Sequence, residues 1–238
     1  MPHRSPSLRF VGSLFFWIAI LLGILLTLAS AWPDMEATVY GFVKYTNVPL
    51  PSFSCPVLMT SLDRAPVSIR LHNPTDKPLT QPVRAQFSSM ISVVTVDEKV
   101  KLQPGETRKL SWEVGEENVD LNNFIFARVL TFPSSSVKMS ESTCGTLVLN
   151  LPFKGGPVIY YASLFLTVAG AGFGLLLFKR HSDFSEPSDV SAWSRMRFIA
   201  IFVAVGLLVS FLGWWPLAIL VLAVSVVALT VFLMARKD

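Results

Sequence analysis

The stretch FVGSLFFWIAILLGILLTLASAW, residues 10–32, contains no charged side chain. A helix rises about 1.5 Å per residue, so this stretch is long enough to cross a bilayer core about 30 Å thick. Three further apolar runs without charges lie toward the C-terminus. We therefore predict a multi-pass membrane protein with four transmembrane α-helices, at residues 10–32, 157–178, 198–213 and 216–234.

Between the first and second predicted spans, residues 33–156 are polar and about as long as an ordinary domain. This segment holds twelve Lys and Arg and twelve Asp and Glu, so its formal charge is zero. The net charge of +4 therefore lies beside the spans, where eight basic residues stand against four acidic ones. A neutral folded domain removes nucleic acid from the expected partners.

The flanking charges predict the orientation of the chain in the membrane. Short segments rich in Lys and Arg stay in the cytoplasm. The basic segments are the N-terminal tail 1–9, the loop 179–197 and the C-terminal tail 235–238. We therefore expect both termini in the cytoplasm and the domain 33–156 on the extracytoplasmic side of the cell membrane.

The end of the first span leaves two alternatives open. Ala29, Ser30 and Ala31 have the small-x-small pattern of a signal peptidase site, after a basic tail and an apolar core. The apolar run is longer than a usual signal core and fills a complete span, which favours a retained anchor. Cleavage after Ala31 would leave three spans and would move neither the domain nor the C-terminus to another side.

The domain shows the pattern of short β-strands. Apolar and polar residues alternate in four segments, which predicts strands with one buried face and one wet face. Two other segments are more continuously apolar, as expected for central strands, and turn residues separate all of these segments. With no helical stretch between strands, we predict an antiparallel β-sandwich. The alternating segments are 67–71, 83–87, 110–114 and 147–151, the apolar ones are 91–96 and 124–132, and 38–43 is the predicted first strand.

Two sequences in this domain resemble a known fold. IRLHNPTDKPL at 69–79 and VKLQPGETRKLSWEV at 100–114 are similar to immunoglobulin-like domains of microbial cell surfaces. In those domains a strand ends at an Asn-rich turn, and a Leu-x-Pro-Gly-Glu turn leads into the next strand. The resemblance covers roughly residues 67–114. It implies an extracytoplasmic all-β immunoglobulin-like sandwich and carries no catalytic residues.

The only two cysteines, Cys55 and Cys144, both lie in the domain. On an oxidising side of the membrane, such a pair predicts a disulfide. Closing a loop of this length would stabilise the folded state by roughly 4 to 5 kcal/mol in the chain-entropy model. The segment VPLPSFSCPVLM at 48–59 has three prolines, so it cannot be a central strand, and we expect the disulfide to hold it as a loop.

This proline-rich loop is the candidate partner-binding segment. Binding residues often lie on loops that a rigid scaffold positions. We therefore expect Leu50 and Phe53 to be exposed apolar anchors for a partner. The alternative is a stapled surface loop without a binding role.

Small residues mark the predicted helix contacts within the membrane. Gly170 and Gly174 form a Gly-x-x-x-Gly pair, and Gly206 and Ser210 offer a similar surface. Such residues let helix backbones approach closely, either within the chain or against another protein. None of the predicted spans contains Asp, Glu, Lys, Arg or His, which argues against an ion-coupled transporter or a pump.

The sequence contains no catalytic or metal-binding motif, because its three histidines lack metal-ligand spacing and no nucleophile elbow or phosphate loop occurs. We therefore expect no cofactor and no enzymatic activity. The leading hypothesis is an accessory or scaffold subunit whose outer domain binds a protein or glycan, and whose helices lie in the bilayer within a larger membrane complex. The alternative is a non-catalytic subunit of a transport or secretion system, with helices that line part of a pathway.

Cysteine labelling in intact cells tests the predicted orientation. A membrane-impermeant reagent should label a Thr75→Cys variant, because this turn belongs to the outer domain. The reagent should miss a Ser188→Cys variant, because this position lies in a basic cytoplasmic loop. Labelling at position 188 without labelling at position 75 would overturn the orientation.

Overall fold

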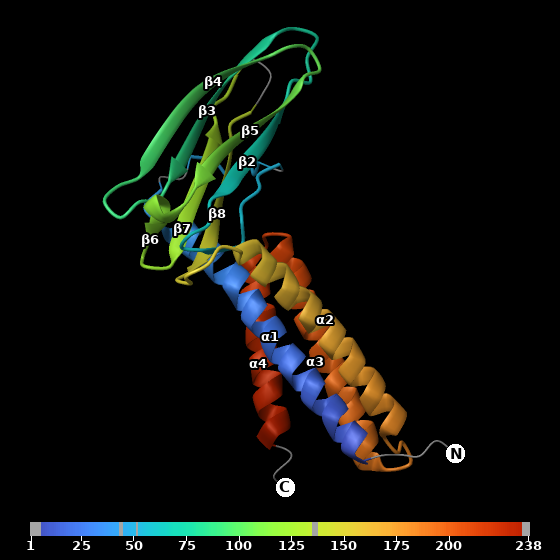
Figure 1. The fold of residues 1–238 in the computed structure, drawn as a ribbon. Coiled ribbons are helices and arrows are strands. Elements are labelled where there is room, and N and C mark those ends of the chain that lie inside the picture. The colour runs from blue at the N-terminus through green and yellow to red at the C-terminus, as the bar shows by residue number, and fades with distance from the viewer. Residues whose placement is uncertain (1–5, 43–44, 51, 135–137, 235–238) are drawn as a thin grey trace. The chain divides into compact units, whose positions relative to one another are not determined.

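A computed structural model describes residues 6–42, 45–50, 52–134 and 138–234. Residues 1–5 of the predicted N-terminal tail and the whole predicted C-terminal tail, 235–238, therefore lie outside the described residues. The chain divides into two compact units. A helical unit comprises 1–31 and 158–238, and a β unit comprises 32–157. Figure 1 shows the elements of both units along the chain.

The helices are α1 (Pro6–Val39), α2 (Gly156–His181), α3 (Pro187–Phe211) and α4 (Trp215–Met234). The first three are long and apolar enough to cross a membrane. The apolar helical stretch of α4, Trp215–Thr230, is shorter. Insertion into a membrane is thus compatible with the observed helices. Three of them extend beyond the uncharged runs, since α1 continues past Trp32, α2 continues to His181 and α3 begins at Pro187.

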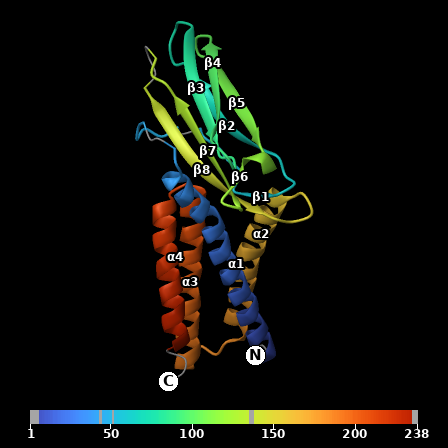
Figure 2. The same cartoon turned by 90° about the vertical axis from the view of Figure 1, so that its left-hand side faces the viewer.

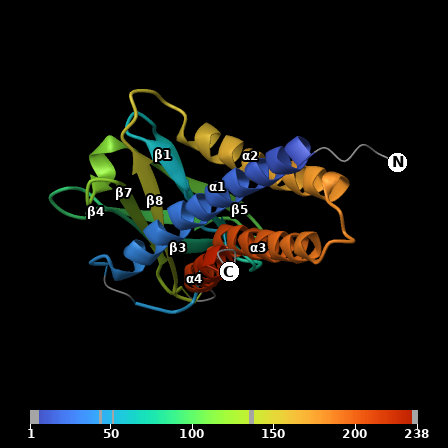
Figure 3. The same ribbon diagram turned by 90° about the horizontal axis from the view of Figure 1, so that it is seen from below.

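Close backbone contacts hold α1 against α2 in the helical unit, and Figure 3 shows α1 passing along α2 while α3 runs beside α4. A Cβ atom added at Gly174 would lie 2.7 Å from the carbonyl oxygen of Gly12 and 2.7 Å from the backbone nitrogen of Phe16. Glycine is therefore required for this approach. The shared apolar core of α1, α2 and α3 consists of Phe16, Ile20, Phe178, Met196, Ile199 and Val203.

An ion pair joins the ends of two helices in this unit. Nη1 of Arg9 on α1 donates to Oδ2 of Asp189 in the first turn of α3, at 2.8 Å. The backbone N–H of Asp183 donates to the same carboxylate oxygen, at 2.8 Å. The Asp189 side chain is buried, and Arg9 remains about half exposed. The contact connects α1, the α2–α3 connection and α3 at one end of the bundle.

The β unit contains two sheets that share one core. The larger sheet has the order β1-β8-β7-β3-β4, with β6 paired to β7, and the smaller sheet pairs β2 with β5. All pairs are antiparallel except β1 with β8, which is parallel, so the predicted antiparallel arrangement is wrong at β1. The strands are β1 (Leu58–Thr60), β2 (Ala65–His72), β3 (Leu79–Phe87), β4 (Val94–Leu102), β5 (Thr107–Val114), β6 (Val119–Asp120), β7 (Phe124–Thr131) and β8 (Ser140–Leu149).

The core of the β unit lies between the two sheets, which Figure 2 shows turned by 90° from Figure 1. Alternate residues of β2 point into it, and so do alternate residues of β7. The period of two in β2 matches the predicted one-sided burial, whereas β7 is buried on both faces, because Phe126, Arg128 and Leu130 are buried as well. Buried side chains from both sheets form one cluster, which includes Val67, Ile69, Leu71, Val83, Ala85, Phe87, Ile125, Ala127 and Val129.

The predicted first strand at 38–43 is wrong, because α1 continues to Val39 and the described residues 40–42 form no strand. Position 43 lies outside the described residues. Contacts with the sheet hold this helix end, since Asp34 accepts from the backbone N–H of Gly145 at 2.9 Å. The Tyr40 ring packs against the Phe126 ring, with centroids 4.5 Å apart, and its hydroxyl donates to the Asp120 carboxylate at 2.6 Å. Burial, together with the neighbouring Asp120, raises the pKa of Tyr40 to about 12, so the phenol stays a neutral donor.

The predicted central strand at 91–96 is also only partly right. Ile91 lies in the bend before β4, and the strand starts at Val94. β4 is an edge strand, because only β3 pairs with it. The other predicted central strand, at 124–132, is β7, which lies between β8 and β3. Apolar composition alone therefore did not distinguish an edge strand from a central strand of the sheet.

The carboxylate of Asp63 ties the β1–β2 turn to the start of α2. It accepts from the backbone N–H groups of Thr60, Gly155 and Gly156, each at 2.8 to 2.9 Å. Burial opposes ionisation of Asp63, but these three donors outweigh it and lower the pKa of the carboxyl group below its usual value. The charged form therefore stabilises the fold.

We expect Gly174→Ala to lower the midpoint of thermal unfolding of the chain in mild detergent. The added methyl would meet backbone atoms of Gly12 and Phe16, and forced overpacking of this kind costs about 1–3 kcal/mol. Gly172→Ala is the matched control, because a Cβ at Gly172 meets nothing within 4 Å. Equal midpoints for the two variants would contradict the close α1–α2 contact.

We expect Asp63→Asn to destabilise the β unit at neutral pH by about 1.5–3 kcal/mol, the range for a hydrogen bond to a charged group. Because the folded pKa is lowered, this stability is present above the unfolded pKa and is lost as the pH falls through the folded pKa. The difference from wild type should therefore shrink in acid. Denaturant unfolding at several pH values measures it, with the exposed Asp76→Asn as control. A pH-independent difference would argue against the charged form.

Candidate functional site

The structure joins Cys55 and Cys144 in a disulfide, as the sequence predicts, with the Cα atoms 6.5 Å apart. Cys144 lies in β8, and the bond therefore holds the proline-rich loop against the larger sheet. Two hydrogen bonds also join the loop to β8. The N–H of Leu50 donates to Oγ of Ser142, and Oγ of Thr146 donates to the carbonyl of Pro56. The loop is firmly attached along much of its length.

The predicted exposure of Leu50 is wrong. Leu50 is 9% exposed and belongs to the apolar core, and Phe53 is partly buried against the same core. The physical reason is the attachment to β8, which turns both side chains inward to cover the edge of the core. Pro51 between them lies outside the described residues. A partner-binding role for Leu50 and Phe53 stays a prediction that no observed contact supports.

The small residues of the helices face other helices of the same chain. A Cβ at Gly170 would lie 3.0 Å from the Cβ of Ala19 on α1, and one at Gly206 would lie 3.4 Å from a methyl of Val221 on α4. Ser210 on α3 makes a buried hydrogen bond with Ser30 on α1. These positions are therefore occupied by internal packing, together with Gly174.

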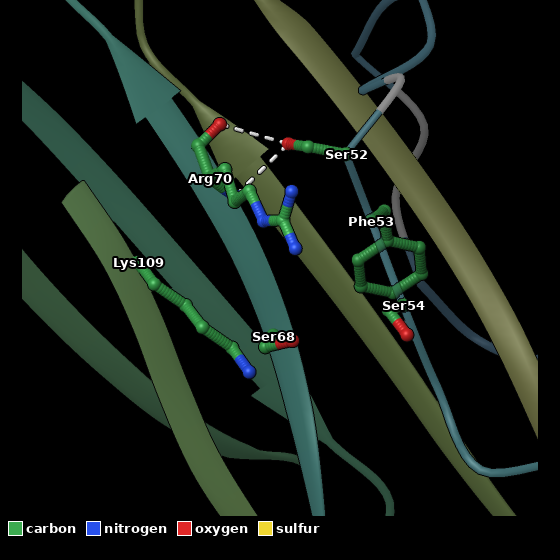
Figure 4. Close-up of a pocket in the computed structure, with 6 residues that line it drawn as sticks. All are labelled: Ser52, Phe53, Ser54, Ser68, Arg70 and Lys109. Atoms are coloured by element: carbon green, nitrogen blue, oxygen red, sulfur yellow. Dashed lines mark hydrogen bonds between the residues drawn. The ribbon is translucent and has the colours of Figure 1, made fainter. Parts of the chain in front are cut away.

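A pocket of about 270 Å³ opens where the proline-rich loop crosses the smaller sheet (Figure 4). The loop runs beside β2, because Ser54 and Ser68 exchange two backbone hydrogen bonds of 2.9 Å. The Oγ of Ser52 donates to the carbonyl of Arg70 at 2.8 Å and accepts from the N–H of Arg70 at 2.9 Å. We name this site the basic pocket, and its lining residues are Ser52, Phe53, Ser54, Ser68, Arg70 and Lys109.

Two cations line the basic pocket without a counter-charge. Arg70 and Lys109 are directly opposite in the β2–β5 pairing, and both are exposed. In Figure 4 the guanidinium of Arg70 extends toward Phe53, and the ammonium of Lys109 extends toward Ser68. No salt bridge within the described part of the chain includes either residue. The other arginines of the strands are paired, as Arg84 with Asp97, Arg108 with Glu106 and Arg128 with Glu141.

A second exposed feature is the tip of the β3–β4 hairpin. Met90 is 85% exposed and Ile91 is 95% exposed. Large apolar side chains in such a position do not contribute to the core of the described structure. We name Met90 and Ile91 the apolar tip.

The buried ion pair of Arg128 and Glu141 is a structural element that sequence reasoning missed. Nη2 of Arg128 lies 2.5 Å from Oε2 of Glu141, which also accepts from the N–H of Tyr45 at 3.0 Å. The guanidinium lies over the Tyr45 ring, 5.0 Å from its centroid, although Nε and Nη1 of Arg128 have no hydrogen-bond partner among the described residues. The pair is closed to solvent and fixes Tyr45 on the outer face of the larger sheet.

Local pattern alone could have located only part of the basic pocket. Alternation in 67–71 places Ser68 and Arg70 on the wet face of a strand. The register that sets Lys109 opposite Arg70 depends on pairing between distant segments. The described residues contain no group of three or more His, Cys, Asp and Glu side chains that could hold a metal ion.

No family model and no curated protein matches the chain. Among solved structures, the chain is similar to a β-glucosidase from Erythrobacter marinus, with 21% identity and a TM-score of 0.26. It is also similar to a β-glucuronidase from Bacteroides uniformis, with 16% identity and a TM-score of 0.28. Each alignment covers 37% of this chain, but only 14% and 12% of those two proteins. The resemblance noted from the sequence therefore stays at the level of the fold, and no activity follows from these similarities.

Proposed function

We propose that the chain is a non-enzymatic, membrane-anchored accessory or scaffold subunit. In this proposal α4 is the fourth transmembrane span, both termini are cytoplasmic, and the β unit is an extracytoplasmic immunoglobulin-like sandwich. The helices dock in a larger membrane complex, and the β unit binds a partner outside the membrane. The observation that carries the proposal is the apolar tip.

The apolar tip fits a contact with a protein. Residues that dominate protein interfaces are large side chains that become fully desolvated on binding. Met is also adaptable in shape, which suits a contact surface. Leu50 is buried in the core, and exposed apolar residues of other loops, such as Leu62 at 48% and Leu121 at 57%, are more covered than Met90 and Ile91. Burial of Met90 and Ile91 by a partner would therefore remove the most exposed large apolar side chains of the described β unit from water.

The edge strand beside the tip favours contact through side chains rather than strand addition. β4 carries Asp97, Lys99 and Lys101 on exposed positions. Charges on an edge strand hinder pairing with another chain. The Arg84–Asp97 ion pair, at 2.7 Å, further occupies this face of β3 and β4. The tip itself is therefore the better contact surface.

Among α1, α2 and α3, α2 offers the most uncovered surface for a membrane partner. Its most apolar window is 17% buried, against 39% for α1 and 33% for α3. The exposed side chains of α2 include Phe165, Val168 and Leu176. In a membrane, lipid or a partner helix would cover this surface, and docking of the complex through α2 is part of the proposal.

The double variant Met90→Ser/Ile91→Ser should fold normally but retain its partner at least about tenfold less well, because loss of two buried apolar anchors costs more than 1.4 kcal/mol of binding. The measurement is cross-linking in cells, followed by purification in mild detergent and quantification of stoichiometric partners. Leu62→Ser/Leu121→Ser is the matched control, because both leucines are exposed elsewhere on the β unit. Equal partner recovery from both double variants would contradict the role of the apolar tip.

A further inference from the structure

We propose that the basic pocket binds the carboxylate of an acidic sugar, as part of an anionic glycan. This inference rests on the proposed function, because it assigns the outer β unit a second ligand class beside the protein partner. The apolar tip and the basic pocket differ in chemistry and in the strands that carry them. The two surfaces can therefore be tested separately.

The charge arrangement of the pocket indicates an anionic ligand. Arg70 and Lys109 occupy directly opposite positions on one face of a two-stranded sheet. Like charges in such a cross-strand pair repel each other and destabilise the pairing. An anion placed between them would reverse this effect. The Arg guanidinium can bind a carboxylate through two parallel hydrogen bonds, and the Lys ammonium adds a point charge.

The remaining lining residues suit a sugar. The hydroxyls of Ser54 and Ser68 can donate and accept hydrogen bonds, and Ser52, whose proton is donated to the carbonyl of Arg70, can still accept one more. Phe53 contributes a partly buried aromatic ring, which can pack against the apolar face of a sugar ring. A concave site with a few convergent polar groups and one aromatic side chain is typical of small-ligand binding.

The pairing of β2 disfavours an extended acidic peptide as the ligand. Peptides often bind by adding a strand to an open sheet edge. At the pocket, one edge of β2 pairs with β5, and the other exchanges backbone bonds with Ser54. The backbone of β2 is therefore already satisfied on both sides. The side chains that remain available recognise a compact ligand rather than a peptide backbone.

The wall of the basic pocket is organised before any ligand arrives. Ser54 is adjacent to Cys55, which the disulfide holds to β8. Ser52 is held by both of its hydrogen bonds to the backbone of Arg70. A ligand would therefore not need to order this loop, and preorganisation of this kind increases affinity.

Titration of the purified full-length chain in mild detergent tests the proposal, with a galacturonate trisaccharide as the probe. A galactose trisaccharide, which lacks the carboxylates, should bind at least about tenfold more weakly. Higher salt should weaken galacturonate binding, because the charges are exposed. Equal binding of the two sugars, or no galacturonate binding, would overturn the proposal. Both comparisons use the wild-type chain, so they do not depend on the folding of a variant.

The double variant Arg70→Gln/Lys109→Gln should bind galacturonate at least about tenfold more weakly than wild type. Lys77→Gln/Lys101→Gln removes the same charge from two other exposed positions of the β unit and should leave binding unchanged. Equal losses in both double variants would show a general charge effect and would overturn the assignment. Tighter binding of triglutamate than of galacturonate would also overturn it, in favour of an acidic peptide.

Partner recovery in the same preparations separates this inference from the proposed function. Loss of galacturonate binding with normal partner recovery supports the pocket and leaves the apolar tip as the protein contact. If wild type binds no galacturonate but recovers its partner through Met90 and Ile91, the pocket assignment fails and the accessory role stands. If the Met90→Ser/Ile91→Ser variant binds galacturonate normally and recovers its partner normally, the pocket assignment stands and the proposed protein contact fails.

Discussion

The attachment of the proline-rich loop to β8 is the constraint on which the β unit depends. Proline cannot donate to a β ladder, so residues 48–57 could not pair as a regular strand along their whole length. The Cys55–Cys144 disulfide closes a loop with a sequence separation of 89. In the chain-entropy model such a closure stabilises the folded state by about 4–5 kcal/mol. The attached loop buries Leu50 and supplies one wall of the basic pocket.

The β unit differs from place to place in whether its surface charges are paired. Most exposed guanidinium groups of the strands have a carboxylate within hydrogen-bond distance, as Arg84 does with Asp97. The hydrogen bonds from Arg84 lower the pKa of Asp97, so this pair stays ionised through mildly acidic conditions. Arg70 and Lys109 keep their charges available beside a concave surface. A neutral domain can therefore still contain a locally positive site.

The helical unit relies on close packing and on hydrogen bonds that remain within each helix or between helices. In lipid there is no hydrophobic gain from bringing apolar helices together, so small residues and polar contacts become decisive. Gly12 and Gly174 allow backbone contact between α1 and α2, and Ser30 meets Ser210 between α1 and α3. Because these contacts are used within the chain, the small residues named from sequence are not free to bind another helix there.

The sequence by itself determined the features that depend on local pattern: the apolar helices, the strands with alternating residues such as 67–71, and the cysteine pair. Tertiary structure alone decided the features that depend on distant neighbours. Contacts of Asp34 and Tyr40 with the sheet hold the end of α1, which continues to Val39 and so overlaps the strand predicted at 38–43. Sheet order placed β4 at an edge, and attachment to β8 buried Leu50. Register brought Lys109 opposite Arg70. Periodicity reports which face of an element is buried, whereas register and edge position depend on which segments meet.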